Sequence, residues 1–271
     1  MSNISSPDRP ASPHPAAADD LVIAGKAFRS RFILGSGKFS LDLMRAVIEN
    51  AGTEIVTLAL RRVSVGGPGN ILDHIPPGIT LLPNTSGART ADEAIRIARL
   101  GRELTGSPFV KIEVVPDARY LLPDNGETVR AIEVLAREGF AALPYMHPDL
   151  VAARAMREAG AAAIMPLAAP IGSNRGLTTR EFIRILVEEI DLPIIVDAGI
   201  GRPSEACEAM EMGVAAIMAN TAVATAGNVA VMARAFGAAV EAGRLAWRAG
   251  LGRRLDAGAE ASSPLTGFLR D

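Results

Sequence analysis

The chain has 271 residues, of which 49% are apolar and 21% charged, and its formal net charge is −2. This length suits one α/β barrel domain, and the nearly balanced charge gives no basic surface for nucleic acid or for a membrane. The single cysteine, Cys207, excludes an intrachain disulfide. Three widely spaced histidines predict no metal site: His14, His74 and His147.

The N-terminal segment is rich in proline, serine and alanine. This composition predicts a disordered arm over residues 1–20. No apolar core follows a basic start, so we predict no secretory signal and expect a cytoplasmic protein. No later uncharged run is long and unbroken enough to cross a bilayer. A catalytic domain over residues 21–271 is predicted to begin with a hairpin of two short strands, Leu21–Ile23 and Lys26–Phe28.

After the hairpin, apolar segments rich in β-branched residues recur at even spacing. They predict strands at Arg31–Gly35, Glu54–Leu60, Thr80–Pro83, Phe109–Val114, Ala141–Tyr145, Ala162–Pro166, Ile194–Asp197 and Ala215–Ala219. Helical periodicity is found between strands, at Ala91–Leu104, Glu127–Glu138, Asp149–Glu158, Thr179–Glu189, Ser204–Met212 and Val229–Glu241. The alternation predicts a single (β/α)8 TIM-type barrel. An open doubly wound sheet is the alternative, but no GxGxxG motif follows the first strand.

Several helix ends are marked by particular residues. Thr90 precedes Ala91-Asp92-Glu93 with the spacing of a capping box, and Pro203-Ser204-Glu205 likewise predicts a helix start. Glycines predict four helix ends, at Gly139, Gly160, Gly213 and Gly243. Cys207 lies within a predicted helix and is interpreted as a small buried residue rather than a nucleophile.

A lysine and a glutamate interrupt the apolar strand Phe109–Val114. Side chains alternate along a strand, so Lys111 and Glu113 share one face, and the apolar residues between them share the other. Burial is expected to lower the pKa of the lysine. An amine that is partly neutral at pH 7 is a nucleophile for carbonyl compounds. A structural ion pair is the competing interpretation of the same two residues.

A further carboxylate and three loops are predicted at the C-terminal ends of barrel strands, where active sites of this fold lie. Asp197 ends its strand, and the next helix starts too late for Asp197 to cap it. Backbone N–H groups of glycine-rich loops bind anions, so a phosphate cradle is predicted at Pro170–Gly176, Ala198–Gly201 and Asn220–Ala222. These features favour an imine-forming enzyme for a phosphorylated keto-sugar, with Glu113 and Asp197 moving protons.

The motifs together resemble bacterial thiazole synthase, and the resemblance extends from about Leu21 to Pro264. It is carried by Leu82–Ala91, Val110–Val114, Leu121–Asp124, Met165–Leu167, Ala169–Ser173, Val196–Gly201 and Asn220–Ala222. The resemblance implies that 1-deoxy-D-xylulose 5-phosphate, dehydroglycine and sulfur from a thiocarboxylated carrier protein are condensed into the thiazole phosphate of thiamine. It also implies that the enzyme has no resident metal or other cofactor, and that it assembles as a homo-oligomer, namely a homotetramer.

By position, the resemblance implies that Lys111 forms the imine and that Glu113 and Asp197 are acid–base carboxylates. It implies substrate binding by Gly172, Ala198, Gly199, Asn220 and Thr221. The chain departs from the usual family pattern outside the lysine and the carboxylates, at Ala168, Asn174 and Gly227-Asn228.

Two alternatives stay open at the level of sequence. A class I aldolase-type lyase would share the lysine and the phosphate cradle but would need no carrier protein. A non-catalytic sugar-phosphate-binding barrel would use Lys111 and Glu113 only as an ion pair. The segment Arg61–Asn70 is compatible with a receptor for the carrier's tail, with a cover over the mouth of the barrel and with a plain surface loop. No role is predicted for the C-terminal segment Ala261–Pro264.

Overall fold

The structure is a computed structural model that describes residues 19–35, 41–60 and 74–253. The arm predicted over residues 1–20 therefore lies outside the described residues except for its last two. The segment Arg61–Asn70 and the C-terminal segment Ala261–Pro264 also lie outside them.

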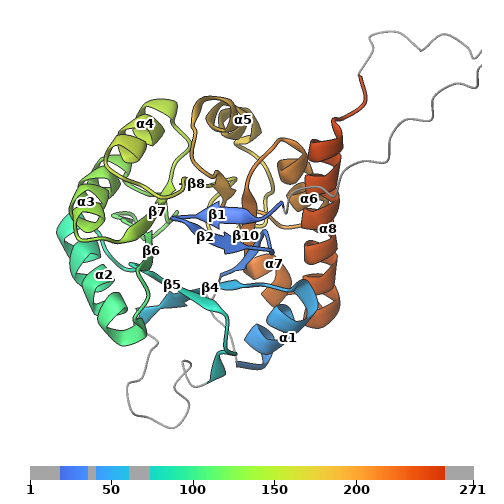
Figure 1. The fold of residues 1–271 in the computed structure, drawn as a ribbon, viewed down its shortest axis with the longest axis horizontal. Helices are drawn as coiled ribbons and strands as arrows, with labels where there is room; N and C mark the ends of the chain where they lie inside the picture. The colour runs from blue at the N-terminus through green and yellow to red at the C-terminus, as the bar shows by residue number, and fades with distance from the viewer. Residues whose placement is uncertain (1–18, 36–40, 61–73, 254–271) are drawn as a thin grey trace, which may run out of the picture.

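The described strands after the hairpin form one parallel sheet that closes on itself (Figure 1). Its order is β8-β7-β6-β5-β4-β3-β10-β9. Backbone bridges between Ile164 and Ile194 and between Leu167 and Asp197 join the two outer strands, β8 and β9. The closure confirms the barrel and excludes the open sheet. The strands are β3 (Phe32–Leu34), β4 (Ile55–Ala59), β5 (Thr80–Asn84), β6 (Phe109–Ile112), β7 (Ala141–Met146), β8 (Met165–Pro166), β9 (Ile195–Val196) and β10 (Ala216–Ala219).

Helices surround the barrel, as Figure 1 shows. Five of them were predicted within two residues of their bounds, α8 was predicted to end eight residues too early, at Glu241, and α1 and α7 were not predicted individually. Among the described helices, none is both long and apolar enough to cross a membrane. The helices are α1 (Leu41–Ala51), α2 (Ala91–Thr105), α3 (Asn125–Arg137), α4 (Leu150–Glu158), α5 (Arg180–Glu189), α6 (Pro203–Glu211), α7 (Thr221–Ala224) and α8 (Val229–Ala249).

The predicted helix ends are correct with one exception. Thr90 caps α2 by accepting a hydrogen bond from the Glu93 backbone N–H at 3.3 Å. Three of the predicted end glycines adopt positive φ: Gly139, Gly160 and Gly213. The prediction for Gly243 was wrong, because α8 continues to Ala249.

Gly243 is explained by the packing of α6 against α8. A Cβ atom at this position would lie 2.4 Å from the backbone oxygen of Cys207, so only glycine allows the two helices to approach so closely. Cys207 itself is partly buried, and burial raises the pKa of its thiol. A thiol with a raised pKa is a poor nucleophile, which supports the structural interpretation of Cys207.

Two apolar layers lie on the two faces of the sheet. The outer layer, between strands and helices, contains Val110 and Ile112 of β6. The inner layer fills the barrel and contains Phe109 of the same strand. Because neighbouring residues of β6 lie in different layers, the predicted parity of β6 is confirmed, and Lys111 belongs to the interior of the barrel. In both layers, each fully buried aliphatic side chain contributes about 1.5–3 kcal/mol to folding.

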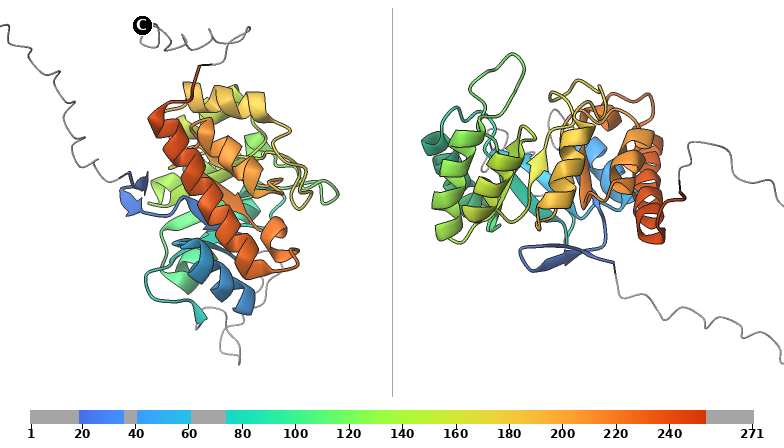
Figure 2. Two further views of the ribbon diagram at one scale, coloured as in Figure 1. Left: turned by 90° about the vertical axis from the view of Figure 1, so that its right-hand side faces the viewer. Right: turned by 90° about the horizontal axis from the view of Figure 1, so that it is seen from above.

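A hairpin closes the N-terminal end of the barrel (Figure 2, right). It consists of β1 (Leu21–Ile23) and β2 (Lys26–Phe28), which pair antiparallel as predicted. Three of its side chains belong to the inner apolar layer, namely Leu21, Ile23 and Phe28. The hairpin therefore covers the interior from below and leaves the C-terminal ends of the strands as the side from which a ligand can enter.

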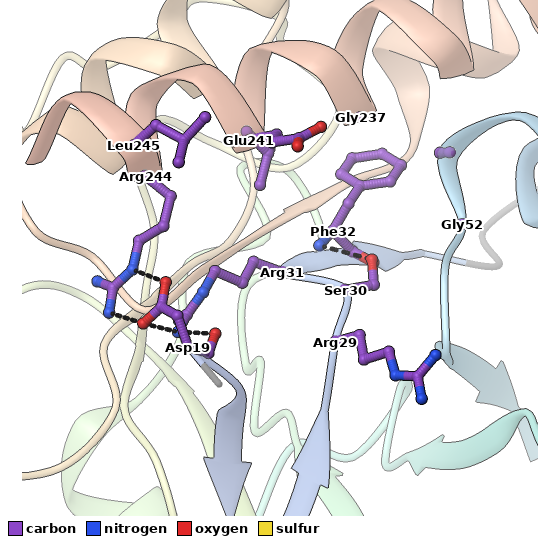
Figure 3. Close-up of a pocket in the computed structure, with 12 residues that line it drawn as sticks. Asp19, Arg29, Ser30, Arg31, Phe32, Gly52, Gly237, Glu241, Arg244 and Leu245 are labelled. Atoms are coloured by element: carbon purple, nitrogen blue, oxygen red, sulfur yellow. Dashed lines mark hydrogen bonds and ion pairs between the residues drawn. The ribbon is translucent and has the colours of Figure 1, made fainter. Parts of the chain in front are cut away.

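Beside the hairpin, Asp19 pairs with Arg31, which directly precedes β3, and with Arg244 of α8 (Figure 3). Arg244 donates two hydrogen bonds to its carboxylate, at 2.9 and 2.8 Å, and Arg31 donates one at 3.2 Å. These residues line a cavity of about 400 Å³ with Arg29, Ser30, Phe32, Ala51, Gly52, Gly237, Val240, Glu241 and Leu245. The cavity lies near the N-terminal end of the barrel, at the opposite end from Lys111 and Asp197. The cavity is therefore part of the packing at the N-terminal end of the barrel and is not part of the predicted active site.

Candidate active site

The predicted lysine and both predicted carboxylates meet inside the barrel. The Lys111 Nζ atom lies 2.6 Å from Asp197 Oδ2 and 2.9 Å from Glu113 Oε1. Lys111 and Asp197 are each 3% exposed, and Glu113 is 8% exposed. The structure thus brings together Lys111 of β6, Glu113 just after that strand, which ends at Ile112 rather than at Val114, and Asp197 just after β9. One amine is held by two carboxylates in a site from which water is largely excluded.

Glu113 is fixed by a residue that the sequence reasoning did not single out. The Thr85 hydroxyl, just after β5, donates to the Glu113 carbonyl and accepts from the Glu113 N–H, both at 2.8 Å. Thr85 is completely buried. Because both bonds involve the Glu113 backbone, they set the position of the residue and leave its carboxylate available to Lys111. In the sequence, the only sign of this role was a threonine close to a predicted strand end, and such threonines are common.

The protonation of Lys111 differs from the expectation. Burial lowers the pKa of the amine, as predicted, but attraction and hydrogen bonds from Asp197 and Glu113 together outweigh burial. The pKa of Lys111 therefore lies above its ordinary value, which corrects the expected fall. In this arrangement the lysine is an ammonium ion at neutral pH, and it must lose a proton before it can attack a carbonyl.

Asp197 is suited to receive that proton. Burial raises the pKa of its carboxyl, although the charge of Lys111 opposes the rise. One amine and two carboxylates would carry a net charge of −1 if all were ionised, and burial disfavours such an excess. Burial therefore favours states of Lys111, Glu113 and Asp197 in which the three side chains together hold more protons and less net charge. A structural ion pair would need only one carboxylate, so the second carboxylate favours acid–base work over mere support.

Tyr145 is a second residue that the sequence reasoning missed. It is fully buried on β7, and the centre of its ring lies 5.4 Å from Lys111 Nζ. Burial, followed by the charges of Asp197 and Glu113, raises the pKa of its phenol. The phenol is therefore neutral and acts as a hydrogen-bond donor. The alternation of side chains places Tyr145 inside the barrel, but nothing in the sequence showed that it faces the lysine.

The loops after β8 and β9 have backbone conformations that favour glycine. Gly172 has φ +75° and Gly199 has φ +82°, while Ala198 has φ +57°. A Cβ atom on Gly199 would lie 2.4 Å from the Ala169 backbone nitrogen, so glycine is required there for space as well as for φ. The Gly176 N–H donates to the Gly199 carbonyl at 2.8 Å and ties the two loops together.

Asn220 and Thr221 come from the end of the neighbouring strand β10, where α7 begins. A Cβ atom on Gly172 would lie 3.6 Å from the Thr221 hydroxyl, so the loops after β8 and β10 lie side by side. The Ser173 hydroxyl is buried and has no hydrogen-bond partner among the described residues. The five predicted substrate-binding residues thus lie on three adjacent loops at the C-terminal end of the barrel, next to this buried hydroxyl.

Glu205 of α6 supports the loops after β8 and β9. It is a third residue that the sequence reasoning did not assign to the site. Its Oε2 accepts hydrogen bonds from the backbone N–H groups of Gly201 at 2.8 Å and Arg202 at 3.0 Å. A Cβ atom on Gly176 would lie 2.6 Å from Glu205 Oε1. Glu205 was recognised only as part of a helix start. Its contacts with two different loops required the tertiary structure.

The departures from the family pattern are accommodated locally. Asn174 has φ +50°, a conformation in which asparagine is the most tolerated residue after glycine. Asn228 caps α8 by accepting from the Val231 N–H at 3.1 Å. Ala168 is completely buried and donates its N–H to the Asp197 carbonyl at 3.0 Å.

The described residues contain no group of three or more His, Cys, Asp or Glu side chains that could hold a metal ion.

Comparison with known proteins agrees with the resemblance. Residues 22–264 match the family model described as thiazole biosynthesis protein ThiG. Thiazole synthase of Clostridium beijerinckii is 66% identical over 253 residues, which is 93% of this chain and 99% of that protein. Thiazole synthase of Campylobacter jejuni is 68% identical over 253 residues, 93% of this chain and 97% of that protein.

Solved structures share the fold of this chain at two levels of sequence identity. A chain of the BexX/CysO complex of Amycolatopsis orientalis has a TM-score of 0.78 and 35% identity, covering 88% of this chain and 98% of its own length. The 3-hexulose-6-phosphate synthase of Salmonella typhimurium has a TM-score of 0.52 at 15% identity, covering 78% of this chain and 98% of its own, and shows a shared fold alone. The barrel, the site and these matches together show that the chain belongs to the ThiG thiazole biosynthesis protein family.

Proposed function

We propose that this thiazole synthase condenses 1-deoxy-D-xylulose 5-phosphate, dehydroglycine and carrier-bound sulfur, and that Lys111 forms an imine with the sugar ketone. The observation that carries the imine is the position of the Lys111 amine between two buried carboxylates, 2.6 Å from Asp197 and 2.9 Å from Glu113. A buried lysine with a proton acceptor within hydrogen-bond distance is the arrangement that nucleophilic attack on a carbonyl needs.

The first steps can be written with this geometry. The Lys111 ammonium passes a proton to Asp197, whose raised pKa makes it a suitable acceptor. The neutral amine attacks the ketone carbon to give a carbinolamine. The proton on Asp197 then helps the hydroxyl group to leave as water, and an iminium forms. The iminium draws electrons from the neighbouring C–H bond, so Glu113 or Asp197 can take that proton and give an enamine.

The phosphate of the sugar is proposed to bind at the three loops after β8, β9 and β10. Gly172, Gly199 and Thr221 supply a site without bulky side chains, and the Ser173 hydroxyl is left without a protein partner. Backbone N–H groups in such turns bind anions without adding a positive side chain. The phosphate would hold the ketone within reach of Lys111, so the cradle acts by positioning the substrate.

A carrier protein with a C-terminal thiocarboxylate is proposed to deliver the sulfur, and dehydroglycine to supply the nitrogen. The similarity to a chain from the BexX/CysO complex supports a protein partner for this barrel. The resemblance further leads us to propose a cytoplasmic homotetramer that needs no resident metal or cofactor. Light scattering of the purified chain tests the tetramer directly.

The test of the imine is reductive trapping. Borohydride added with 1-deoxy-D-xylulose 5-phosphate should leave one covalent adduct, and peptide mass spectrometry should place it on Lys111. Absence of an adduct would support the non-catalytic sugar-phosphate-binding barrel. In a second assay, turnover should require the thiocarboxylated carrier. Cleavage of the sugar phosphate without any carrier would support the aldolase-type lyase.

A further inference from the structure

Tyr145 connects the lysine with a loop at the mouth of the barrel. Its ring centre lies 5.4 Å from Lys111 Nζ, within the range of a cation–π contact. Its hydroxyl, at the other end of the side chain, donates to the Leu121 carbonyl at 3.3 Å. The side chain is completely buried. One rigid group therefore touches both the amine and the loop.

The loop over residues 115–124 joins β6 to α3 and stands above the helices in Figure 2 (right). Its two ends are fixed, because the Val115 N–H donates to the Ala88 carbonyl and the Asp124 N–H donates to the Val114 carbonyl, both at 2.9 Å. The Asp117 carboxylate accepts from the Arg119 and Tyr120 N–H groups, both at 3.0 Å. These contacts organise the two ends and the turn of the loop.

The tip of the loop is apolar and exposed. Tyr120 is 54% exposed, and Leu121 and Leu122 are 36% and 38% exposed. Leu121 has φ +56°, a conformation that a leucine does not hold without compensating contacts. The Tyr145 hydroxyl supplies one of these contacts at the Leu121 carbonyl. The tip is thus hydrogen-bonded to a residue of the candidate active site.

We propose that Tyr145 is a positioning residue that joins the 115–124 loop to Lys111, its hydroxyl fixing the loop at Leu121 and its ring orienting the amine. The two halves of the side chain have separate tasks. Substitution can therefore separate them, because phenylalanine removes the hydroxyl and keeps the ring, whereas an aliphatic residue removes both.

The first experiment measures hydrogen–deuterium exchange of the full-length protein without substrate. In Tyr145→Phe, amides of the 115–124 loop should exchange about fivefold faster, as the loss of one hydrogen bond predicts. The strands of the barrel should be unchanged. Tyr120→Phe is the matched control, since it removes a phenol from the exposed tip and should leave exchange near Leu121 unaltered. Wild-type exchange of the loop in Tyr145→Phe would overturn the role of the hydroxyl.

The second experiment follows the rate of borohydride trapping of the sugar phosphate against pH. Tyr145→Phe should keep the wild-type midpoint, because the ring still faces the ammonium. Tyr145→Leu should shift the midpoint to lower pH, because the ammonium loses the aromatic face that stabilises its charge. Tyr145→Met, which fills the space with a flexible chain, should shift it in the same direction and serves if the leucine variant fails to fold. An unchanged or higher midpoint in the aliphatic variants would overturn the role of the ring.

The pH experiment rests on the proposed imine function, whereas the exchange experiment does not. If the wild-type protein gives no adduct, the proposed function fails while the hydroxyl contact is still tested by exchange. If the wild-type protein is trapped and the variants behave as the wild type, only the role of Tyr145 fails.

Discussion

The Lys111 Nζ atom lies 2.6 Å from Asp197 Oδ2, although β7 and β8 separate their strands in the barrel. The contact spans the interior rather than running along the sheet. It exists because the barrel closes and turns the residues at the strand ends toward a common centre. Lys111 therefore lies within reach of a carboxylate on a strand that is not its neighbour. An open sheet would not bring these two side chains together.

Replacement of Lys111 by arginine tests whether the amine reacts or only pairs. Lys111→Arg keeps a positive charge for Glu113 and Asp197, but guanidinium does not act as the amine nucleophile. We expect loss of turnover by at least about a thousandfold, as for removal of a nucleophile, and no adduct in trapping experiments. Lys26→Arg is the control, because Lys26 lies in the hairpin and donates to Thr80 at 2.7 Å, away from the site. Near-normal turnover of Lys111→Arg would remove the lysine from the mechanism.

Asp197→Asn should separate the charge of the carboxylate from its size. Loss of a carboxylate that raises the pKa of Lys111 should move the midpoint of imine trapping to lower pH. Turnover should nevertheless fall by roughly 100- to 10,000-fold, because an amide does not accept the proton. Both are read from pH–rate profiles of trapping and of product formation. A midpoint that stays in place would show that Asp197 does not control the lysine.

Gly199→Ala should weaken the phosphate cradle. The new methyl group would lie 2.4 Å from the Ala169 backbone nitrogen, and the residue would keep φ +82°. We expect a loss of unfolding free energy of more than about 1 kcal/mol and a raised KM for the sugar phosphate. The control is Gly139→Ala, which has nearly the same φ, +80°, and nothing within 4 Å of the added Cβ. Equal effects in the two variants would mean that φ alone, and not the contact between loops, matters at Gly199.

Asp19→Asn should destabilise the protein, through the ion pairs at the N-terminal end of the barrel, in a pH-dependent manner. A hydrogen bond from Arg244, helped by the charges of Arg31, Arg244 and Arg248, lowers the pKa of Asp19 against the effect of burial. A carboxyl with a lowered folded-state pKa stabilises the protein above its unfolded value of 3.8, and this contribution is lost as pH falls through the folded value. We expect a loss of about 1–2 kcal/mol at pH 7.

Urea unfolding at pH 7 and near pH 3 measures this effect. The difference between Asp19→Asn and the wild type should shrink at the lower pH. Asp20→Asn removes an exposed neighbouring carboxylate and should change stability little at either pH. A difference that is constant with pH would assign the contribution of Asp19 to packing rather than to its charge.

Particular residues show where sequence reasoning succeeded and where it failed. The alternation of polar and apolar residues in β6 placed Lys111 inside the barrel correctly, because strand parity is a local property. Gly243 was misread as a helix end, because its reason is a contact with Cys207 on another helix. The lowered pKa expected for Lys111 was wrong for the same kind of reason, since Asp197 comes from a distant strand.

The amino-acid sequence by itself determined the barrel, the position of the lysine inside it, the two carboxylates and the three loops, because periodicity, strand parity and glycine-rich turns depend on neighbours in the chain. Only the tertiary structure decided that Asp197 lies against Lys111, that Thr85 holds Glu113 and that Tyr145 joins the lysine to the 115–124 loop. The physical reason is that these contacts join residues from different strands, at distances set by the closure of the barrel. The charge state of the lysine follows from those distances and not from its own strand.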